Sequence, residues 1–422
     1  MKRRSFLSQC VMASLGAASG PLARAGFRKG AAERPDRPAS PGKKDMPVLE
    51  LKGTARERGR IHGESLKKEI REMLELSHSA AREAGLSPED YGRQIVGGTG
   101  FLAAAEQWTP ALVEEIRGIG EGAGVDFTTI FAWNLLDESD WFINQGRWQN
   151  PSSLPKSGCS AFGVFKEGGR PALLAQNADM GPDFDGCQTL LRISHDDSDL
   201  EELVLTCPGC VGIWGLNNRS IGVCLNALTS QLQRSPSGLG TLFVARGILS
   251  HSRVEEAVRF VQTVKHASGE VYTIGGPDEV VCLEASANKV SRFVPHPGAT
   301  RVYHTNHPLV SDDLWLEKNS FERVAPQFKE AFKKHRLNSE TRLESLQERL
   351  RDTSKPVTVE TAKSILSSHD DPEYPVCRHG RPGQGDITTF SMIMVLKPSP
   401  EFHVAPGPPC KTEFRTYTFQ SG

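Results

Sequence analysis

The glycine–cysteine pair Gly158-Cys159 has the residue types and the order needed for chemistry on the chain itself. Glycine tolerates many backbone conformations, so Gly158 lets the Cys159 thiol reach the carbonyl carbon in front of it. Attack there converts the peptide bond into a thioester, and hydrolysis then releases Cys159 with a free α-amine. Such an amine has a pKa of about 7.7–8.0 and can act as general base for its own thiol. The pair therefore predicts self-cleavage before Cys159 and a nucleophilic role for its thiol.

Two polar residues further along the chain are candidates to assist this thiol. Asp179 ends a predicted hairpin that returns toward Cys159, and its carboxylate is placed to orient the new amine. Asn226 ends a second predicted hairpin and is a candidate donor to an oxyanion. From residue types alone a core role for Cys159 stays open, because single buried cysteines most often pack as small hydrophobic side chains.

The patterns around these residues predict an α+β protein of antiparallel sheets covered by helices. Before Cys159, helical periodicity covers 54–83 and 107–120. The glycine-rich segment 118–124 follows a helix and not a strand, so it predicts a helix stop and a turn instead of a phosphate-binding loop.

After Cys159 the pattern changes to strands and helices that come in blocks. Strands are predicted at 160–165, 172–176, 211–216, 221–226, 270–275, 279–285, 289–294, 301–304, 388–396, 401–405 and 413–419. Helices are predicted at 318–334, 338–351 and 358–368. A capping box, Ser252 with Glu255, predicts a further helix that runs to about residue 264.

The N-terminus has the features of an export signal. The adjacent Arg3-Arg4 precede a modest apolar stretch, and small residues at 23–25 suit a signal peptidase, so residues 1–25 resemble a twin-arginine leader. Residues 26–45 have the composition of a flexible linker. We therefore expect a periplasmic or secreted protein with no membrane span once the leader is removed.

The charge balance argues against a nucleic-acid partner. The net charge of the chain is −1, but residues 1–45 hold ten Lys/Arg and three Asp/Glu. The remaining body carries 40 basic and 48 acidic residues. A nucleic-acid site needs a basic surface, and this body is mildly acidic.

Several motifs, in matching order, resemble the acyl-coenzyme A:6-aminopenicillanate acyltransferase family. They are Gly158-Cys159-Ser160, Gln176-Asn177-Ala178-Asp179, Gly222-Val-Cys-Leu-Asn226-Ala-Leu228, His304-Thr-Asn-His307, Cys377-Arg-His379 and Gly407-Pro-Pro-Cys410, preceded by 118–124, Asn134 and Asp137-Glu138. The resemblance covers most of 48–420. It implies an N-terminal-nucleophile αββα sandwich that cuts itself before Cys159 and then catalyses amide hydrolysis or acyl transfer. One domain is expected as two associated fragments, 46–158 and 159–422.

The resemblance also implies roles for single residues. Cys159 is then the nucleophile, Asp179 orients its amine, and Asn226 stabilises the oxyanion. Arg323 is the candidate for a family arginine that follows the Thr-Asn-His segment. The family's Gln-Asn-Trp-Asp reads Gln-Asn-Ala-Asp here, so Ala178 implies a changed acyl pocket.

The expected substrate is a small amide that the enzyme hydrolyses or whose acyl group it transfers. Acyl-coenzyme A is a cytoplasmic metabolite, and export would separate the enzyme from it, which favours hydrolysis. Three alternatives stay open. They are an acyl-coenzyme A-dependent N-acyltransferase, an inactive processed binding protein of the envelope, and a papain-like thiol hydrolase that pairs Cys159 with a distant His379 in an uncut chain.

The remaining cysteines and histidines predict structural roles. Cys207-Pro-Gly-Cys210 has the spacing of a redox motif, but no second such motif and no histidine cluster accompanies it, so a structural turn is expected. His304, His307 and His379 lack local metal-ligand spacing, and hydrogen-bonding roles are expected for them. Neither a metal nor a cofactor is expected.

Overall fold

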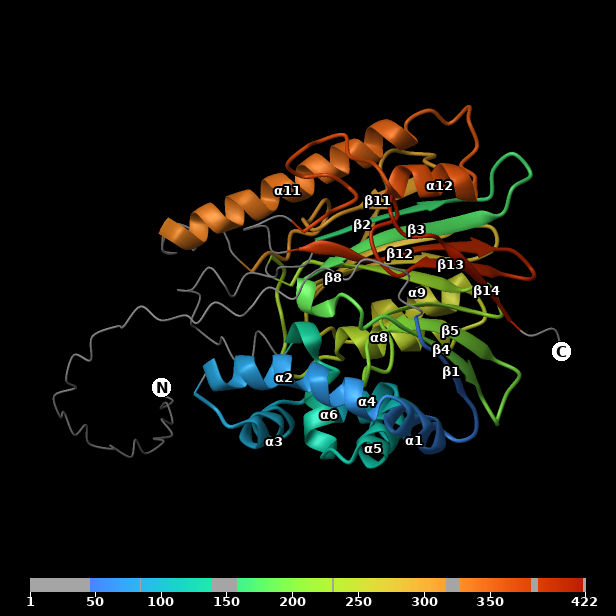
Figure 1. Ribbon diagram of the computed structural model, residues 1–422. Coiled ribbons are helices and arrows are strands. Elements are labelled where there is room, and N and C mark those ends of the chain that lie inside the picture. Colours follow the sequence, from blue (N-terminus) through green and yellow to red (C-terminus); the bar gives the residue numbers. More distant parts are fainter. Residues whose placement is uncertain are drawn as a thin grey trace, which may run out of the picture. The chain divides into compact units, whose positions relative to one another are not determined.

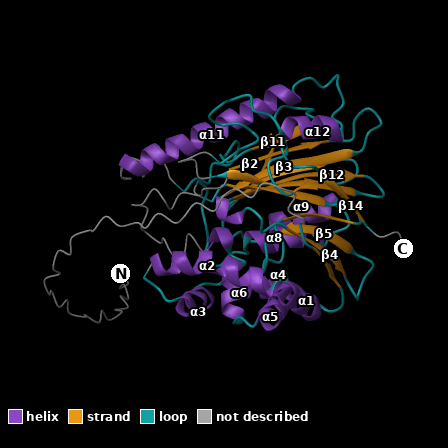
Figure 2. Cartoon of the chain, viewed as in Figure 1, coloured by secondary structure: helices purple, strands orange, loops and turns teal. Residues whose placement is uncertain are grey.

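The computed structural model describes residues 46–83, 85–138, 158–229, 231–315, 326–380 and 386–419. These residues form an α+β structure in which two sheets lie face to face between helices (Figure 1, Figure 2). The predicted leader and linker, residues 1–45, and the candidate Arg323 lie outside the described residues. Within the described ranges, no helix is both long and apolar enough to cross a membrane.

Sheet A has eight strands and includes one strand from before Cys159. Its order is β1-β4-β5-β6-β7-β8-β9-β10. The bounds are β1 Val48–Leu51, β4 Thr189–Ser194, β5 Glu201–Thr206, β6 Trp214–Asn217, β7 Gly222–Ala227, β8 Glu270–Gly275, β9 Val280–Ala285 and β10 Val290–Phe293. The strands pair antiparallel except for β1, which pairs with β4 in parallel. This edge departs from the predicted antiparallel sheets, because the long connection between β1 and β4, which includes α1 to α6, β2 and β3, allows the chain to re-enter sheet A in the same direction.

Sheet B has six strands and carries Cys159. Its order is β11-β2-β3-β12-β13-β14. The bounds are β2 Gly158–Val164, β3 Ala172–Met180, β11 Arg301–His304, β12 Ile387–Leu396, β13 Glu401–Ala405 and β14 Arg415–Thr418. Every residue of β2 is buried, as expected for a central strand that is covered on both faces.

Helices form the two outer layers of the structure. Their bounds are α1 Ala55–Ser65, α2 Lys67–Glu83, α3 Pro88–Gly98, α4 Phe101–Trp108, α5 Pro110–Ala123, α6 Phe127–Trp133, α8 Thr241–Leu249, α9 Val254–Thr263, α11 Pro326–Leu350 and α12 Val359–Leu366. Helices α8 and α9 pack on sheet A, whereas α11 and α12 pack on sheet B (Figure 1). Because β2 and β3 of sheet B contact β7 and β8 of sheet A, the order of layers confirms the predicted αββα sandwich.

A close contact between α1 and α5 explains the glycine-rich segment 118–124. A Cβ on Gly118 would lie 2.1 Å from the carbonyl oxygen of Arg56, so the two helices touch backbone to backbone. The predicted helix stop occurs only at the end of the segment, where Gly124 adopts a left-handed conformation (φ 65°) at the C-cap of α5. Most of the segment is therefore helical, which corrects the expectation.

The predicted capping box of the helix after residue 250 is absent. Helix α9 begins at Val254, with Arg253 at the N-cap and no capping bond from a side chain. A capping box joins the N-cap residue to the third helical residue. With this start, Ser252 lies before the N-cap and Glu255 is the second helical residue, so the two do not occupy these positions.

Two other predicted boundaries also change. The helices predicted at 318–334 and 338–351 are continuous over the described part, because no glycine or proline interrupts α11 after Pro326. The strand predicted at 211–216 is limited to β6, because the backbone N–H of Val211 donates to the side chain of Asn134 at 2.8 Å instead of to a strand.

The Cys207-Pro-Gly-Cys210 segment forms a structural turn, as predicted. The N–H of Cys210 donates to the carbonyl of Cys207 at 3.0 Å. Inside the turn, the N–H of Gly209 donates to His62 Nε2 at 3.0 Å, and the carbonyl of Gly209 accepts from Asn134 Nδ2 at 2.9 Å. The turn therefore attaches sheet A to the helices that precede Cys159.

We expect His62 to make the protein sensitive to acid. Burial, followed by the charge of Arg246, lowers the pKa of His62 from 6.5 to about 4. Between these values the unfolded chain binds a proton that the folded chain does not, so the free energy of unfolding falls as the pH drops through this window. His62→Gln should reduce that fall by about 2 kcal/mol between pH 7 and about pH 4.5. Urea unfolding of Cys159→Ala chains, which cannot cut themselves, measures it.

His296→Gln is the matched control, because His296 is exposed. This control should keep the pH dependence of the parent chain. An identical loss of stability on acidification in the His62→Gln variant and its parent would contradict the prediction.

Candidate active site

Cys159 lies near the start of β2, in the interior of sheet B. Gly158 pairs with Asp179 and Cys159 with Ala178 on the neighbouring strand β3. The Cys159 side chain is 6% exposed and packs into the core between the two sheets. An external substrate therefore has almost no access to the thiol in the uncut chain, whereas the carbonyl of Gly158 is its immediate neighbour.

Two polar side chains hold the backbone of Cys159. Its N–H donates to Asn306 Oδ1 at 2.7 Å, and its carbonyl oxygen accepts from Arg342 Nη1 at 2.5 Å. Arg342 also donates from Nη2 to Asn306 Oδ1 at 3.0 Å and from Nη1 to Ser160 Oγ at 3.0 Å. Asn306 follows β11 and Arg342 lies on α11, so a neighbouring strand and a covering helix meet at this residue.

Arg342 is a buried cation on the inner face of α11. It is 1% exposed, and Asn338, one turn earlier on the helix, accepts from its Nε at 2.8 Å. Burial lowers the pKa of Arg342 to about 10, and the charge of Asp179 opposes this fall. The guanidinium group therefore stays charged at neutral pH, and the nearby carboxylate compensates for part of its lost hydration.

Asp179 is a fully buried carboxyl group near two arginines. Its Oδ1 accepts from Thr388 Oγ1 at 2.7 Å, whereas Oδ2 has no hydrogen-bond partner among the described residues. Burial raises the pKa of Asp179, and the charges of Arg378 and Arg342 act against this rise. A carboxyl group with one oxygen available and a raised pKa is suited to accept and return a proton.

Close packing, and not an unusual backbone conformation, explains the glycine at position 158. A Cβ on Gly158 would lie 2.8 Å from Arg378 Nη1, 3.3 Å from Arg342 Nη2 and 3.4 Å from Asp179 Oδ2. Its φ is not positive, so this glycine does not use the backbone conformations open only to glycine that were expected of it. Its small size matters instead, because a side chain would contact the groups around it. Two guanidinium groups and one carboxyl group thus surround the residue just before the nucleophile.

The thiol of Cys159 is protonated in the uncut chain. Burial raises its pKa to about 12, and the negative charge of Asp179 adds to the rise. A hydrogen bond from the backbone of Asp179 to the sulfur and the charge of Arg342 act in the opposite direction. Any attack by this sulfur therefore requires a proton acceptor close by.

Asn226 comes from the opposite sheet. It is fully buried near the end of β7, and its Nδ2 donates to the carbonyl of His304 at 3.3 Å, a long bond for an amide. Its Oδ1 is buried without a hydrogen-bond partner among the described residues. The next residue, Ala227, accepts through its carbonyl from Asn306 Nδ2 at 3.2 Å. Asn306 therefore connects the end of β7 to the backbone of Cys159.

The structure brings together most of the predicted site residues and adds four that the sequence analysis did not name. Gly158, Cys159 and Asp179 lie side by side in β2 and β3, and Asn226 reaches from β7 of sheet A to the carbonyl of His304 on β11, the other neighbour of β2. Arg323 lies outside the described residues, so the structure does not place it. The additional side chains are those of Asn306, Arg342, Arg378 and Thr388.

A signal in the sequence was present for three of these four residues. Asn306 belongs to the His-Thr-Asn-His motif and Arg378 to the Cys-Arg-His motif. Arg342, like Arg323, follows the first of these motifs in the chain. Arg342 is the arginine that the described structure places against Cys159. Spacing could not distinguish the two arginines, because both lie in or beside predicted helices.

The three histidines singled out in the sequence make contacts with groups other than Cys159. His304 Nε2 bonds to Glu284 Oε1 at 2.9 Å and His307 Nδ1 to Ser339 Oγ at 2.7 Å, so both have the hydrogen-bonding roles that the sequence predicts. The described contacts of His379 are to His369 and to two cysteines other than the nucleophile. They give no support to the papain-like alternative.

The family of the chain follows from its sequence match. Residues 165–401, more than half of the 422, match the acyl-coenzyme A:6-aminopenicillanic acid acyl-transferase family. The chain belongs to this family. Asp179, Asn226 and Arg342 lie inside the matched range, whereas Cys159 lies just before it. The description of the family names an acyl-transfer reaction.

Individual relatives are distant. Protein dcd1B of Dictyostelium discoideum is 22% identical over an alignment of 302 residues, and the match covers 65% of this chain and 57% of that protein. The chain thus spans somewhat over half the length of this curated relative. An N-acylethanolamine-hydrolyzing acid amidase ortholog from Caenorhabditis elegans is 14% identical with a TM-score of 0.37, covering 62% of this chain and all of that one. A conjugated bile acid hydrolase from Clostridium perfringens is 12% identical with a TM-score of 0.39, covering 62% of this chain and 97% of that one.

We expect Arg342→Lys to destabilise the fold and to disturb the site. A lysine ammonium cannot bond at once to Asn306, Asn338 and the Cys159 carbonyl as the planar guanidinium does. The free energy of unfolding should fall by about 1–3 kcal/mol, the range for hydrogen bonds to charged groups. Chemical denaturation in the Cys159→Ala background measures this change.

Arg336→Lys is the matched control on the same helix. Arg336 pairs with Glu340, and its side chain is 43% exposed, so the substitution should change stability by no more than about 0.5 kcal/mol. Equal changes in the free energy of unfolding at positions 336 and 342 would show that the buried network around Cys159 contributes no more to stability than an exposed ion pair.

Proposed function

We propose that this protein is a self-cleaving cysteine amidohydrolase that becomes active when the bond between Gly158 and Cys159 is cut. The observation that carries the proposal is the burial of the Cys159 thiol. The thiol is next to the carbonyl of the preceding residue, whereas an external substrate has almost no access to it. Asp179, Arg342 and Arg378 surround the same junction. Membership of the family supports amide hydrolysis or acyl transfer by such a residue.

Self-cleavage begins with attack of the Cys159 sulfur on the carbonyl carbon of Gly158. Asp179 is the proposed acceptor of the thiol proton, because among the neighbouring charges that of Asp179 has the largest effect on the thiol pKa and its Oδ2 accepts no hydrogen bond from the described residues. The C–N bond then breaks, the nitrogen takes up a proton, and a thioester joins Gly158 to the sulfur. Water hydrolyses the thioester to give the Gly158 carboxylate, the free thiol and the α-amine of Cys159.

Turnover then uses the new α-amine of Cys159. Its pKa of about 7.7–8.0 lets it remove the thiol proton at neutral pH. Asn306 Oδ1, which already accepts from this nitrogen, and the carboxylate of Asp179 are the groups that we propose orient it. The thiolate attacks the substrate carbonyl, the amine of the substrate leaves with a proton, and water hydrolyses the acyl thioester. Asn226 is the proposed oxyanion donor, since its long bond to His304 is easily replaced.

The contacts between the two fragments support their continued association after cleavage. Strand β1 of the first fragment is hydrogen-bonded to β4 of the second. Glu115 of the first fragment forms a buried ion pair with Arg246 of the second at 3.1 Å, and Arg246 also pairs with Glu202 at 2.8 Å. Separating the fragments would expose these charges and a shared core, so the cut protein should remain one particle.

We expect purified wild-type protein to consist of two associated fragments, the second beginning with Cys159. Cys159→Ala should leave one uncut chain, because the variant has no thiol behind the scissile carbonyl. Denaturing electrophoresis and N-terminal sequencing measure cleavage, and size exclusion under native conditions measures association.

Cys224→Ala is the matched control for this experiment. Cys224 is a buried cysteine on the facing strand β7, and its thiol pKa is influenced by Cys159, but it does not follow the scissile bond. This variant should still cut itself. An uncut wild-type chain that nevertheless hydrolyses amides would overturn the mechanism.

Export favours hydrolysis over transfer from acyl-coenzyme A. We propose that residues 1–25 direct the protein out of the cytoplasm, as the Arg3-Arg4 pair suggests, and fractionation of cells that make the full chain tests this location. Outside the cytoplasm, the acyl thioester on Cys159 meets water far more often than it meets a coenzyme A-linked substrate. The working reaction is then hydrolysis of a small amide, with acyl transfer to amines as a side reaction.

Competition between donors tests the reaction type. Processed protein should turn over simple acyl amides in water and use acyl-coenzyme A with an amine acceptor much less efficiently, measured as kcat/KM. Asn226→Ala should lower amide turnover by about 100- to 1,000-fold, the usual loss for an oxyanion donor. Efficient use of acyl-coenzyme A with no reaction on amides would replace the hydrolase by an N-acyltransferase. Cut protein inert toward both donors would favour a binding protein of the envelope.

A further inference from the structure

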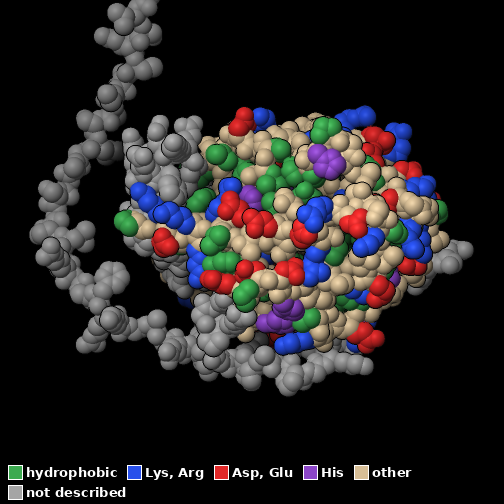
Figure 3. Space-filling view, turned by 90° about the horizontal axis from the view of Figure 1, so that it is seen from above, with side chains coloured by type: hydrophobic (Ala, Val, Ile, Leu, Met, Phe, Trp, Pro, Cys, Tyr) green, Lys and Arg blue, Asp and Glu red, His purple; other side chains and the backbone are tan. Residues whose placement is uncertain are grey.

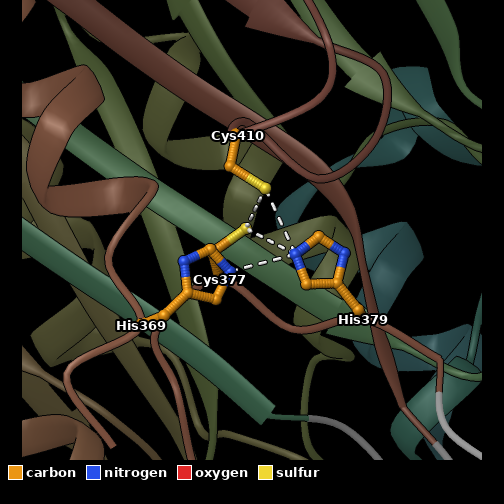
Figure 4. Close-up of side chains that lie close together, drawn as sticks. All are labelled: His369, Cys377, His379 and Cys410. Atoms are coloured by element: carbon orange, nitrogen blue, oxygen red, sulfur yellow. Dashed lines mark hydrogen bonds between the residues drawn. The ribbon is translucent and has the colours of Figure 1, made fainter. Parts of the chain in front are cut away.

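Four side chains outside the proposed active site converge near one point of the described structure. They are His369, Cys377, His379 and Cys410, and one nitrogen or sulfur atom from each lies within 4.8 Å of all the others. Figure 4 shows the two imidazole rings and the two sulfurs turned toward a common centre. The ligand atoms come from the segment after α12 and from the loop between β13 and β14.

The distances between these atoms match the edges of a tetrahedron around a zinc ion. Zinc bonds of about 2.3 Å to sulfur and about 2.0–2.1 Å to nitrogen place two sulfurs about 3.8 Å apart, sulfur and nitrogen about 3.6 Å, and two nitrogens about 3.4 Å. The Sγ atoms of Cys377 and Cys410 are 3.6 Å apart. His379 Nε2 lies 3.8 Å and 3.2 Å from these sulfurs and 3.0 Å from His369 Nε2. Small adjustments make all four atoms ligands of one ion.

We propose that these four side chains bind one zinc ion in a closed structural site. Two thiolates and two imidazoles form the donor set that zinc prefers in tetrahedral structural sites. A disulfide between Cys377 and Cys410 is the competing use of the two sulfurs, and it would leave His369 and His379 hydrogen-bonded to each other at 3.0 Å. The zinc ion uses all four groups, and its charge offsets that of both thiolates.

The position of the site suggests what the ion stabilises. Arg378, which approaches Gly158, lies between two of the ligands in the chain, and its N–H donates to Thr388 Oγ1 at 2.9 Å. The N–H of Cys377 donates to the carbonyl of Ser368 at 3.0 Å. The zinc ion therefore joins the segment that carries Arg378 to the loop that carries Cys410. Because His369 and Cys410 are exposed, the ion can enter from solvent.

Metal analysis of the full chain, purified without chelators and with reductant, tests the proposal. We expect about one zinc per chain. Cobalt substitution should give thiolate charge-transfer bands and the strong visible bands of a tetrahedral site. His369→Asn and Cys410→Ser should each lower zinc content at least about 10-fold, and both replace exposed side chains that the core does not need for packing. His296→Gln and Cys187→Ser, which change a histidine and a cysteine elsewhere, should retain the metal.

The outcome is independent of the proposed hydrolase activity, because Cys159→Ala should bind zinc as well as the wild type. Substoichiometric zinc in wild-type protein refolded with excess zinc and reductant would overturn the proposal. So would mass spectrometry that finds only a Cys377–Cys410 disulfide in freshly purified protein. Unchanged zinc content in both ligand variants, with the controls also loaded, would likewise assign the metal to other residues.

Discussion

The crowding around residue 158 is the constraint on which the rest of the site depends. A guanidinium nitrogen lies only 2.8 Å from the place where a Cβ would be, so a side chain at this position would have to displace the end of Arg378. Arg378 pairs with Asp386 at 3.4 Å, and the charges of Arg378 and Arg342 both act on the buried carboxyl group of Asp179. The same carboxyl group pairs with Gly158 across the two strands. Charge balance, strand register and the glycine thus place the thiol, the carbonyl and a proton acceptor together.

Burial has opposite consequences for the two reactions proposed for Cys159. In the uncut chain it raises the pKa of the thiol to about 12, so the sulfur is unreactive toward outside molecules. The same burial keeps the sulfur beside a single carbonyl. This proximity raises the rate of attack on that carbonyl and compensates for the low reactivity of the protonated thiol. A cut removes the covalent link that closes the end of β2 and adds a base with a pKa of about 7.7–8.0. Activation then changes both access to the thiol and its protonation.

The sequence predicted the fold class and the central residues because these depend on local signals. Alternation over 160–165 and 172–176 predicted the hairpin of β2 and β3, which places Asp179 beside Gly158. Contacts between distant segments left no such signal. Arg342 is one of several arginines on a polar helix, and only the packing of α11 selects it. The cluster around His379 was missed for the same reason, because its ligand atoms come from two segments, one after α12 and one between β13 and β14.

The strand order of sheet B has a consequence for the life of the newly made chain. Strand β2 is bracketed by β11 and β3, and β3 by β12, which begins at Ile387. Thr388 on that last neighbour holds the carboxyl group of Asp179. These groups can assemble only after the chain has been synthesised through β12, so the proposed cut at Gly158 would follow the folding of that strand. A cut chain would then report that β12 had joined sheet B, which would make cleavage a checkpoint on the assembly of the sheet.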